Sequence, residues 1–149
     1  MDGGGDARGA AGELKRPSRM ADLLILAHGG SWEMRFQISS LAASAAAAGE
    51  RVDVALFFGA LDAWARGRWD ELDPRPPLTA ARLEALAMPP LSGILASGRQ
   101  EGLVRLYACS ASARLLGLDT TQVQAAVDAI LGWQSFSRMI RDAARVVTL

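Results

Sequence analysis

The sequence predicts an α/β fold in which helices alternate with the strands of one open, mostly parallel sheet. Short apolar runs recur along the chain, and stretches with helical spacing lie between them. Half of the 149 residues are hydrophobic, so a chain of this length can bury a core as one domain. Alternation of this kind is typical of doubly wound sheets, for which we assume the strand order 2-1-3-4-5.

The beginning of the chain differs in composition from the rest. Its first 19 residues are rich in glycine and mixed charge and lack the apolar segment of a signal peptide. We therefore expect residues 1–19 to form a disordered tail and residues 20–149 to form a single α/β domain. Met20 is a candidate for the true start of translation.

The first expected strand–helix–strand unit spans residues 23–58. Residues 23–27, Leu-Leu-Ile-Leu-Ala, are apolar throughout, as in a strand that is covered on both faces. Ser31 can cap the helix that follows, and Gly49 can end it. A second strand over residues 52–58 completes a right-handed βαβ unit. The inward-facing residues of the helix recur every three or four positions: Met34, Ile38, Leu41, Ala45 and Ala48.

The remainder of the chain continues this alternation with two interruptions by proline. We expect one helix over residues 60–72 and a linker over residues 73–77, Asp-Pro-Arg-Pro-Pro. The later expected elements are helices at 80–87 and 91–101, a strand at 103–108, a short helix ending near Gly117, a helical turn at 120–125, a strand at 127–131, a helix at 134–143 and a last strand at 145–149.

Composition excludes several classes of function. Sixteen basic and 16 acidic residues give a formal net charge of zero, unlike the basic surface of a nucleic-acid-binding protein. One cysteine and one histidine cannot supply the four ligands of a structural zinc site, and one cysteine cannot form an internal disulfide. No apolar run is long enough to span a membrane. We therefore expect a cytoplasmic protein without a bound metal or cofactor.

A ligand site in an open α/β sheet lies at the carboxyl ends of the strands, where the strand order reverses. In the assumed order this reversal falls between the first and third strands. The loops after these two strands carry the only histidine and the only cysteine, so we expect them to face each other across one crevice. The expected pocket comprises His28, Gly29, Gly30, Trp32, Ser110 and Ser112 around Cys109.

Cys109 is the candidate catalytic residue of this crevice. It falls where a helix begins, and the free N–H groups and positive dipole end of a helix stabilise a thiolate. Ser110 and Ser112 can bind an anion or a terminal sulfur, and glycines allow a ligand close to the backbone. In many α/β proteins, however, a lone cysteine is a small buried apolar residue, and a histidine after the first strand is an ordinary loop residue.

Several segments of the chain form a recognisable set. The most specific is Leu106-Tyr107-Ala108-Cys109-Ser110-Ala111-Ser112-Ala113-Arg114 with Gly117. More generic segments are His28-Gly29 before a helix entering at Trp32–Phe36, the helix into Gly49 with the strand Val52–Phe58, Gly132-Trp133 before a helix, and the last strand Arg145–Leu149. In these segments, from residue 23 to its end, the chain resembles the DsrE/DsrF-like family, which includes the TusB, TusC and TusD sulfur-relay subunits.

This resemblance implies a flavodoxin-like three-layer sandwich and a sulfur-carrier function. Cys109 would accept sulfane sulfur as a persulfide and pass it on, which is sulfurtransferase chemistry. Because the chain has no second cysteine, the acceptor would be another protein or a small thiol. The family also implies assembly, as a homotrimer or homohexamer or with DsrE-like relatives.

Two other functions remain open at the level of sequence. The chain could be a non-catalytic module that binds a small anion or nucleotide in the crevice, with Cys109 only packing. It could also be an oligomeric structural subunit whose interface includes Trp64, Trp69 and the apolar segment 86–95.

Overall fold

The computed structural model describes residues 20–74 and 78–149. The tail expected over residues 1–19, and residues 75–77 of the expected linker, lie outside the described residues. The strands are β1 (Leu23–Ala27), β2 (Val52–Leu56), β3 (Val104–Cys109), β4 (Ala129–Leu131) and β5 (Arg145–Thr148). The helices are α1 (Trp32–Ala47), α2 (Phe58–Ala65), α3 (Ala80–Ala85), α4 (Leu91–Gln100), α5 (Ser110–Leu115), α6 (Thr120–Ala126) and α7 (Trp133–Asp142).

The five strands form one all-parallel sheet, so the predicted α/β class and three-layer architecture are confirmed. The assumed strand order, however, is wrong: the observed order is β4-β3-β2-β1-β5. Each of the first three connections steps to the next strand in the same direction, and only β5 lies on the other side of β1. The apolar runs in the sequence indicate that strands are covered, but they carry no information about which strands are neighbours.

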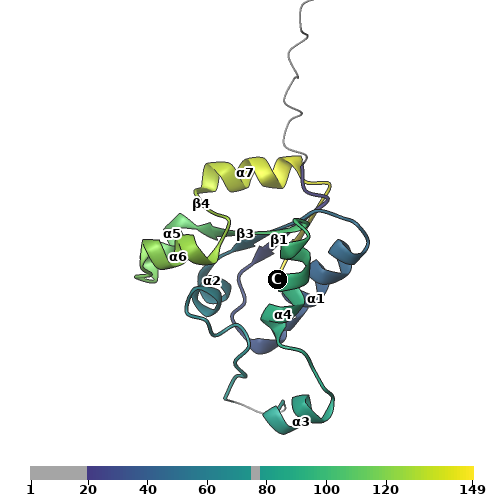
Figure 1. Cartoon of the computed structure of the whole chain (residues 1–149). Coiled ribbons are helices and arrows are strands. Elements are labelled where there is room, and N and C mark those ends of the chain that lie inside the picture. Colours follow the sequence, from purple (N-terminus) through teal and green to yellow (C-terminus); the bar gives the residue numbers. More distant parts are fainter. Residues whose placement is uncertain (1–19, 75–77) are drawn as a thin grey trace, which may run out of the picture.

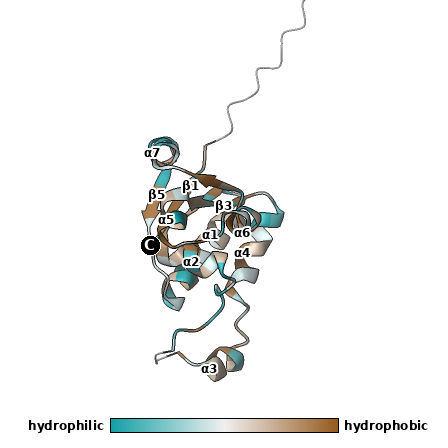
Figure 2. Ribbon diagram, turned by 90° about the vertical axis from the view of Figure 1, so that its left-hand side faces the viewer, coloured by the Kyte–Doolittle hydropathy of each residue, from teal (hydrophilic) through white to brown (hydrophobic). Residues whose placement is uncertain are grey.

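The helices are divided very unequally between the two faces of the sheet. Figure 1 shows α7 alone on one side and α1, α2, α4 and α6 on the other, and Figure 2 shows the same separation from a second direction. Right-handed crossovers account for this division, because only the connection from β4 to β5 runs back across the sheet. That connection spans roughly 19 Å between the edge strands, whereas a ten-residue helix is about 15 Å long. We call the side that carries α7 the α7 face.

Side chains alternate between the two faces along the central strands. In β2, Val52, Val54 and Leu56 enter the large core beneath α1, α2 and α4. The residues between them point to the α7 face, where a smaller core consists of Leu24, Ala55, Phe57, Cys109 and Phe136. Cys109, the last residue of β3, therefore lies on the α7 face, which only one helix covers.

Two expected helices have different limits or orientations in the structure. The helix expected over residues 60–72 ends at Ala65, because the chain turns at Gly67, whose φ is +68°. Residues 66–74 form an irregular segment instead. In α7, Phe136 is buried, whereas the apolar side chain of Ile140 is exposed, so only part of the helix faces the sheet. None of the helices in the described residues is both long enough and apolar enough to cross a membrane.

Candidate functional site

Cys109 occupies the junction between a central strand and a helix, as the sequence predicts. It is the last residue of β3 and the N-cap residue of α5, and its side chain makes no capping hydrogen bond. Only 1% of the residue is exposed. It belongs to the small apolar core of the α7 face, together with Phe57 and Phe136. Cys109 is a free thiol that this core separates from solvent.

A stack of aromatic rings lies on the same side of the sheet as Cys109. Phe57, the residue after β2, stacks on Trp133 with ring centroids 5.1 Å apart and packs against Phe136 at 5.0 Å. On its other side it stacks on the imidazole ring of His28 at 4.7 Å. Phe57 was not among the residues predicted for the site. An aromatic residue at the carboxyl end of a central strand could have indicated that it belongs there.

The expected crevice between His28 and Cys109 depended on the wrong strand order. Because β2 lies between β1 and β3, Phe57 stands between the loops that carry these two residues. The His28 side chain is exposed, and its backbone N–H donates to the carbonyl oxygen of Leu149 at 2.6 Å. His28 therefore does not belong to the immediate surroundings of the thiol.

Gly29 and Gly30 serve packing within the chain. A Cβ atom on Gly30 would lie 2.9 Å from the backbone of Gly59, and one on Gly29 would lie 2.7 Å from the side chain of Met34. The loop after β1 thus contacts the start of α2 so closely that a side chain cannot fit. The space beside Gly30 that we expected a ligand to use is already filled by the backbone of Gly59.

Trp32 belongs to the core and not to a pocket. Its ring is buried and stacks on Phe36 with centroids 5.5 Å apart. Its backbone N–H donates to Asp73 Oδ2 at 2.7 Å, so a carboxylate distant in sequence satisfies a free N–H at the start of α1.

The two serines that follow Cys109 have different surroundings. Ser110 is half-buried, and its Oγ lies 3.9 Å from the position that a Cβ on Gly132 would take. Ser112 is fully buried, and its Oγ has no hydrogen-bond partner among the described residues. Cys109 is the N-cap residue and Ser112 the third residue of the helix, the two positions that a capping box joins, but no side-chain hydrogen bond joins them here. An unsatisfied hydroxyl of this kind is costly and uncommon.

Exposed aromatic side chains border this region. Trp133 at the start of α7 is 55% exposed, and Phe58 at the start of α2 is 47% exposed. Phe58 also has a φ of +33°, in the left-handed region that non-glycine residues rarely adopt. A large apolar residue that is both strained and exposed has no evident structural role, and such strain is often found at functional sites.

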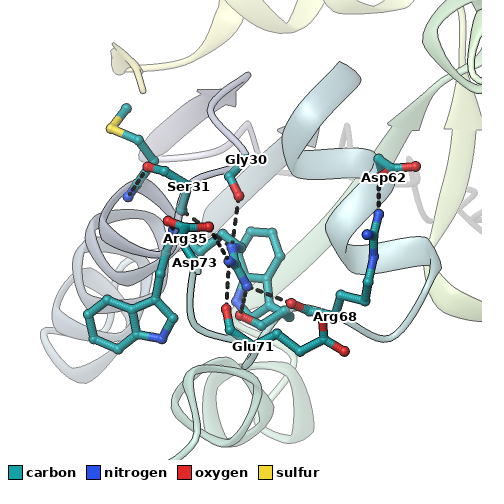
Figure 3. A network of polar contacts seen from close by, with 10 residues as sticks. Gly30, Ser31, Arg35, Asp62, Arg68, Glu71 and Asp73 are labelled. Carbon is teal, nitrogen blue, oxygen red and sulfur yellow. Dashed lines mark hydrogen bonds and ion pairs between the residues drawn. The ribbon is translucent and has the colours of Figure 1, made fainter. Parts of the chain in front are cut away.

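A buried arginine fixes the loop after β1 to the irregular segment that follows α2 (Figure 3). Arg35 is only 3% exposed and forms an ion pair with Asp73 at 3.5 Å. Burial lowers the pKa of Arg35, while the neighbouring acids Asp73, Glu71 and Asp70 act in the opposite direction. Its side chain donates to five backbone carbonyl oxygens: those of Gly30, Ser31, Arg68, Trp69 and Glu71.

Two acids of this segment, Asp70 and Asp73, have structural roles. Asp73 accepts a hydrogen bond from the backbone N–H of Trp32. Asp70 accepts hydrogen bonds from the backbone N–H and the hydroxyl of Ser92, at 2.8 and 2.5 Å, and its carboxylate thereby caps the start of α4. Within residues 20–74 and 78–149, no group of three or more His, Cys, Asp or Glu side chains is placed to hold a metal ion.

A second polar group lies on the α7 face, away from Cys109. Asp53 on β2 and Arg105 on β3 are register partners, and Tyr107 follows two residues later on the same face. Burial raises the pKa of Asp53 against the opposing effect of Arg105, and burial also raises the pKa of Tyr107. Residues 104–109 alternate between apolar and less apolar side chains, and this signal of a half-covered face was available in the sequence.

No family model matches the chain, and no curated protein matches its sequence. The resemblance to the DsrE/DsrF-like family therefore depends on the segments named in the sequence, of which the one around Cys109 is the most specific. Since one α/β architecture supports many functions, the fold does not assign an activity by itself.

Proposed function

We propose that the protein is a sulfur carrier that holds sulfane sulfur as a persulfide on Cys109. The observation that carries this proposal is the position of the only cysteine at the carboxyl end of β3 and at the start of a helix whose third residue, Ser112, has a buried hydroxyl without a partner among the described residues. Resemblance to the DsrE/DsrF-like family in the segment around Cys109 supports the same chemistry.

The proposed transfer needs no oxidant or reductant beyond the two sulfur compounds. The Cys109 thiolate attacks the outer sulfur of a donor persulfide, R–S–SH, and a new S–S bond forms. The donor S–S bond breaks, and the donor leaves as the thiolate R–S⁻. A thiolate of the acceptor then attacks the outer sulfur on Cys109, takes it as a persulfide, and regenerates the Cys109 thiolate.

The local geometry favours the charged intermediates of this transfer. Cys109 is the N-cap residue of α5, where the backbone N–H groups of the first turn have no partner within the helix, although the side chain makes no hydrogen bond to them. These donors stabilise a thiolate, as does the positive end of the helix dipole. The Ser112 hydroxyl has a free proton to donate, and the outer sulfur of a persulfide is a suitable acceptor.

Burial of Cys109 means that a donor must displace part of the aromatic cover. We propose that the Trp133 side chain moves aside, because it is half exposed and belongs to the first residue of α7, directly after Gly132. Exposed Phe58 and Trp133 offer apolar contacts to a protein partner, since aromatic residues are enriched at interfaces. We therefore propose a protein as the sulfur donor or acceptor.

The test is the intact mass of the full chain after incubation with a sulfane-sulfur donor, without reductant. We expect a species heavier by one sulfur that a thiol reverses, that is absent from Cys109→Ser, and that forms more slowly in Ser112→Ala. Equal loading of wild type and Cys109→Ser, or no loading with any donor while both remain folded, would exclude the proposal.

A second candidate function is a non-catalytic binding module, and the burial of Cys109 favours it. In that case the thiol only fills space in the core of the α7 face. A thiol reagent at neutral pH distinguishes the two functions. Labelling of Cys109 in the native protein as slow as global unfolding would support the binding module, and labelling much faster than unfolding would support the carrier.

A further inference from the structure

A cavity of about 300 Å³ lies between α7 and the sheet. Its floor consists of side chains from β1, β2, β3 and β4, and α7 forms its wall. This volume is at the lower end of the range for small-molecule sites, roughly 300–1,000 Å³. Cys109 is on the same face of the sheet but does not line the cavity, so the two features are separate.

The floor of the cavity carries a charged pair in otherwise apolar surroundings. Arg105 Nε donates to Asp53 Oδ1 at 3.1 Å, and the Arg105 guanidinium lies 5.9 Å from the ring centre of Tyr107. Asp53 is only 6% exposed. The Arg105 side chain is 40% exposed, and an ion pair with a solvent-exposed partner adds little to stability. Stability alone therefore does not explain why these polar groups occupy the middle of the sheet.

The wall adds a second arginine from one side of α7. Ser135, Arg138 and Asp142 are spaced by three and four residues, so they lie on one face of the helix. Asp142 accepts two hydrogen bonds from Arg141, at 2.8 and 3.3 Å. Arg138 donates to the Ser135 hydroxyl at 3.2 Å and forms no ion pair with any of the described residues.

The charges of the cavity therefore favour an anion. The lining carries two aspartates and two arginines, and both carboxylates already have a partner: Asp53 pairs with Arg105, and Asp142 pairs with Arg141, which lies outside the lining. Arg138 forms no ion pair among the described residues, so its guanidinium is available to an anion. Arginine binds carboxylate and phosphate groups through two parallel N–H donors. Leu24 and Met139 give the rest of the lining an apolar character.

We propose that this cavity binds a small organic anion, with its acid group against the guanidinium groups of Arg105 and Arg138 and its apolar body against Leu24 and Met139. A pocket in which polar groups converge beside apolar side chains is the usual form of a small-molecule site. Binding here is independent of any sulfur on Cys109.

Benzoate is a suitable probe, because it joins a carboxylate to an apolar ring. We would titrate it into the full ¹⁵N-labelled chain and follow the backbone amide signals of Leu24, Tyr107 and Met139. We expect saturable shifts at these residues. Arg138→Gln should weaken binding by about tenfold, as expected for the loss of one charged hydrogen bond. The matched control Arg82→Gln, on exposed α3, should leave binding unchanged.

A second variant should change the affinity for benzoate in the opposite direction. Asp53→Asn keeps the shape of the side chain and frees the charge of Arg105, so it should strengthen benzoate binding. Circular dichroism of each variant checks that it is folded. Phenyl phosphate distinguishes the acid group: tighter binding than benzoate indicates a phosphate ester, and weaker binding indicates a carboxylate.

Three results would overturn the proposal. The first is the absence of saturable shifts with both benzoate and phenyl phosphate in the folded wild type. The second is equal affinity of Arg138→Gln and Arg82→Gln. The third is binding of inorganic phosphate as tight as that of benzoate, because phosphate alone has no apolar body to contact Leu24 and Met139. The sulfur-loading assay on Cys109 is unaffected by any of them.

Discussion

At the scale of single residues, Arg35 holds together segments that are distant in the sequence. Its guanidinium satisfies backbone carbonyl oxygens of the loop after β1 and of residues 68–71. These carbonyl groups would lose their partners without the arginine, and buried unsatisfied acceptors cost free energy. No sequence pattern predicts this contact, because an arginine on an amphipathic helix normally faces solvent.

Replacing Arg35 should therefore destabilise the fold strongly. We expect Arg35→Met to lower the free energy of unfolding by about 3–5 kcal/mol, because several carbonyl oxygens lose their donor at once, at about 1–3 kcal/mol for each buried one. Arg35→Lys should recover only part of this, because an ammonium group cannot reproduce the planar set of donors. Urea unfolding measures both values. Arg82→Met on exposed α3 is the control, and an equal effect of the two methionine variants would contradict the assigned role.

Phe58 gives a second test at this scale, through its positive φ of +33°. In an ordinary helix glycine is less stable than alanine, by about 1 kcal/mol. At Phe58 the order should reverse, because only glycine adopts a positive φ without strain, which costs an L-residue about 1–2 kcal/mol. Urea unfolding of Phe58→Gly and Phe58→Ala isolates this backbone effect, since both variants lose the same ring. Greater stability of the alanine variant would show that the position is not strained.

At the scale of elements, the sequence predicted the strands and most helices but not their arrangement. The apolar run of residues 23–27 and the Ser31 cap were sufficient to define β1 and the start of α1. The neighbours of β1 depend on contacts between residues far apart in sequence, so the strand order had to be assumed. The predicted crevice failed for this reason, whereas the strand-to-helix junction at Cys109, which is a local feature, was predicted correctly.

The element that controls access to Cys109 is the start of α7. Trp133→Ala removes a ring that stacks on Phe57, an aromatic contact worth about 0.5–1.5 kcal/mol. We expect iodoacetamide to label Cys109 roughly two- to tenfold faster in this variant, because local opening becomes easier by that amount. Labelling is followed by intact mass under native conditions.

The control for this experiment lies on the same helix. Ile140 is exposed on α7, and Ile140→Ala should leave the labelling rate unchanged. Equal acceleration by both variants would mean that α7 opens as a whole. No acceleration by Trp133→Ala would mean that the thiol is reached from elsewhere.

At the scale of the whole molecule, the unequal cover of the sheet is the dominant feature. One helix crosses the α7 face, and Met20, Ile140 and Val146 on that side are exposed. The edge strand β5 is also largely exposed. Edge strands and exposed apolar groups are common sites of association. A composition-based analysis could not find this asymmetry, because it follows from the direction in which the chain crosses the sheet.

The oligomer implied by the family resemblance should therefore form through the α7 face and β5. We expect light scattering at micromolar concentration to give a stable oligomer for the full chain. The double variant Ile140→Asp, Val146→Asp should give a monomer, because buried carboxylates without partners oppose association. Leu86→Asp and Leu115→Asp change exposed apolar residues outside this face and serve as the control. A monomeric wild type would exclude assembly, and an oligomer that survives Ile140→Asp, Val146→Asp but dissociates in the control would move the interface to the other side of the molecule.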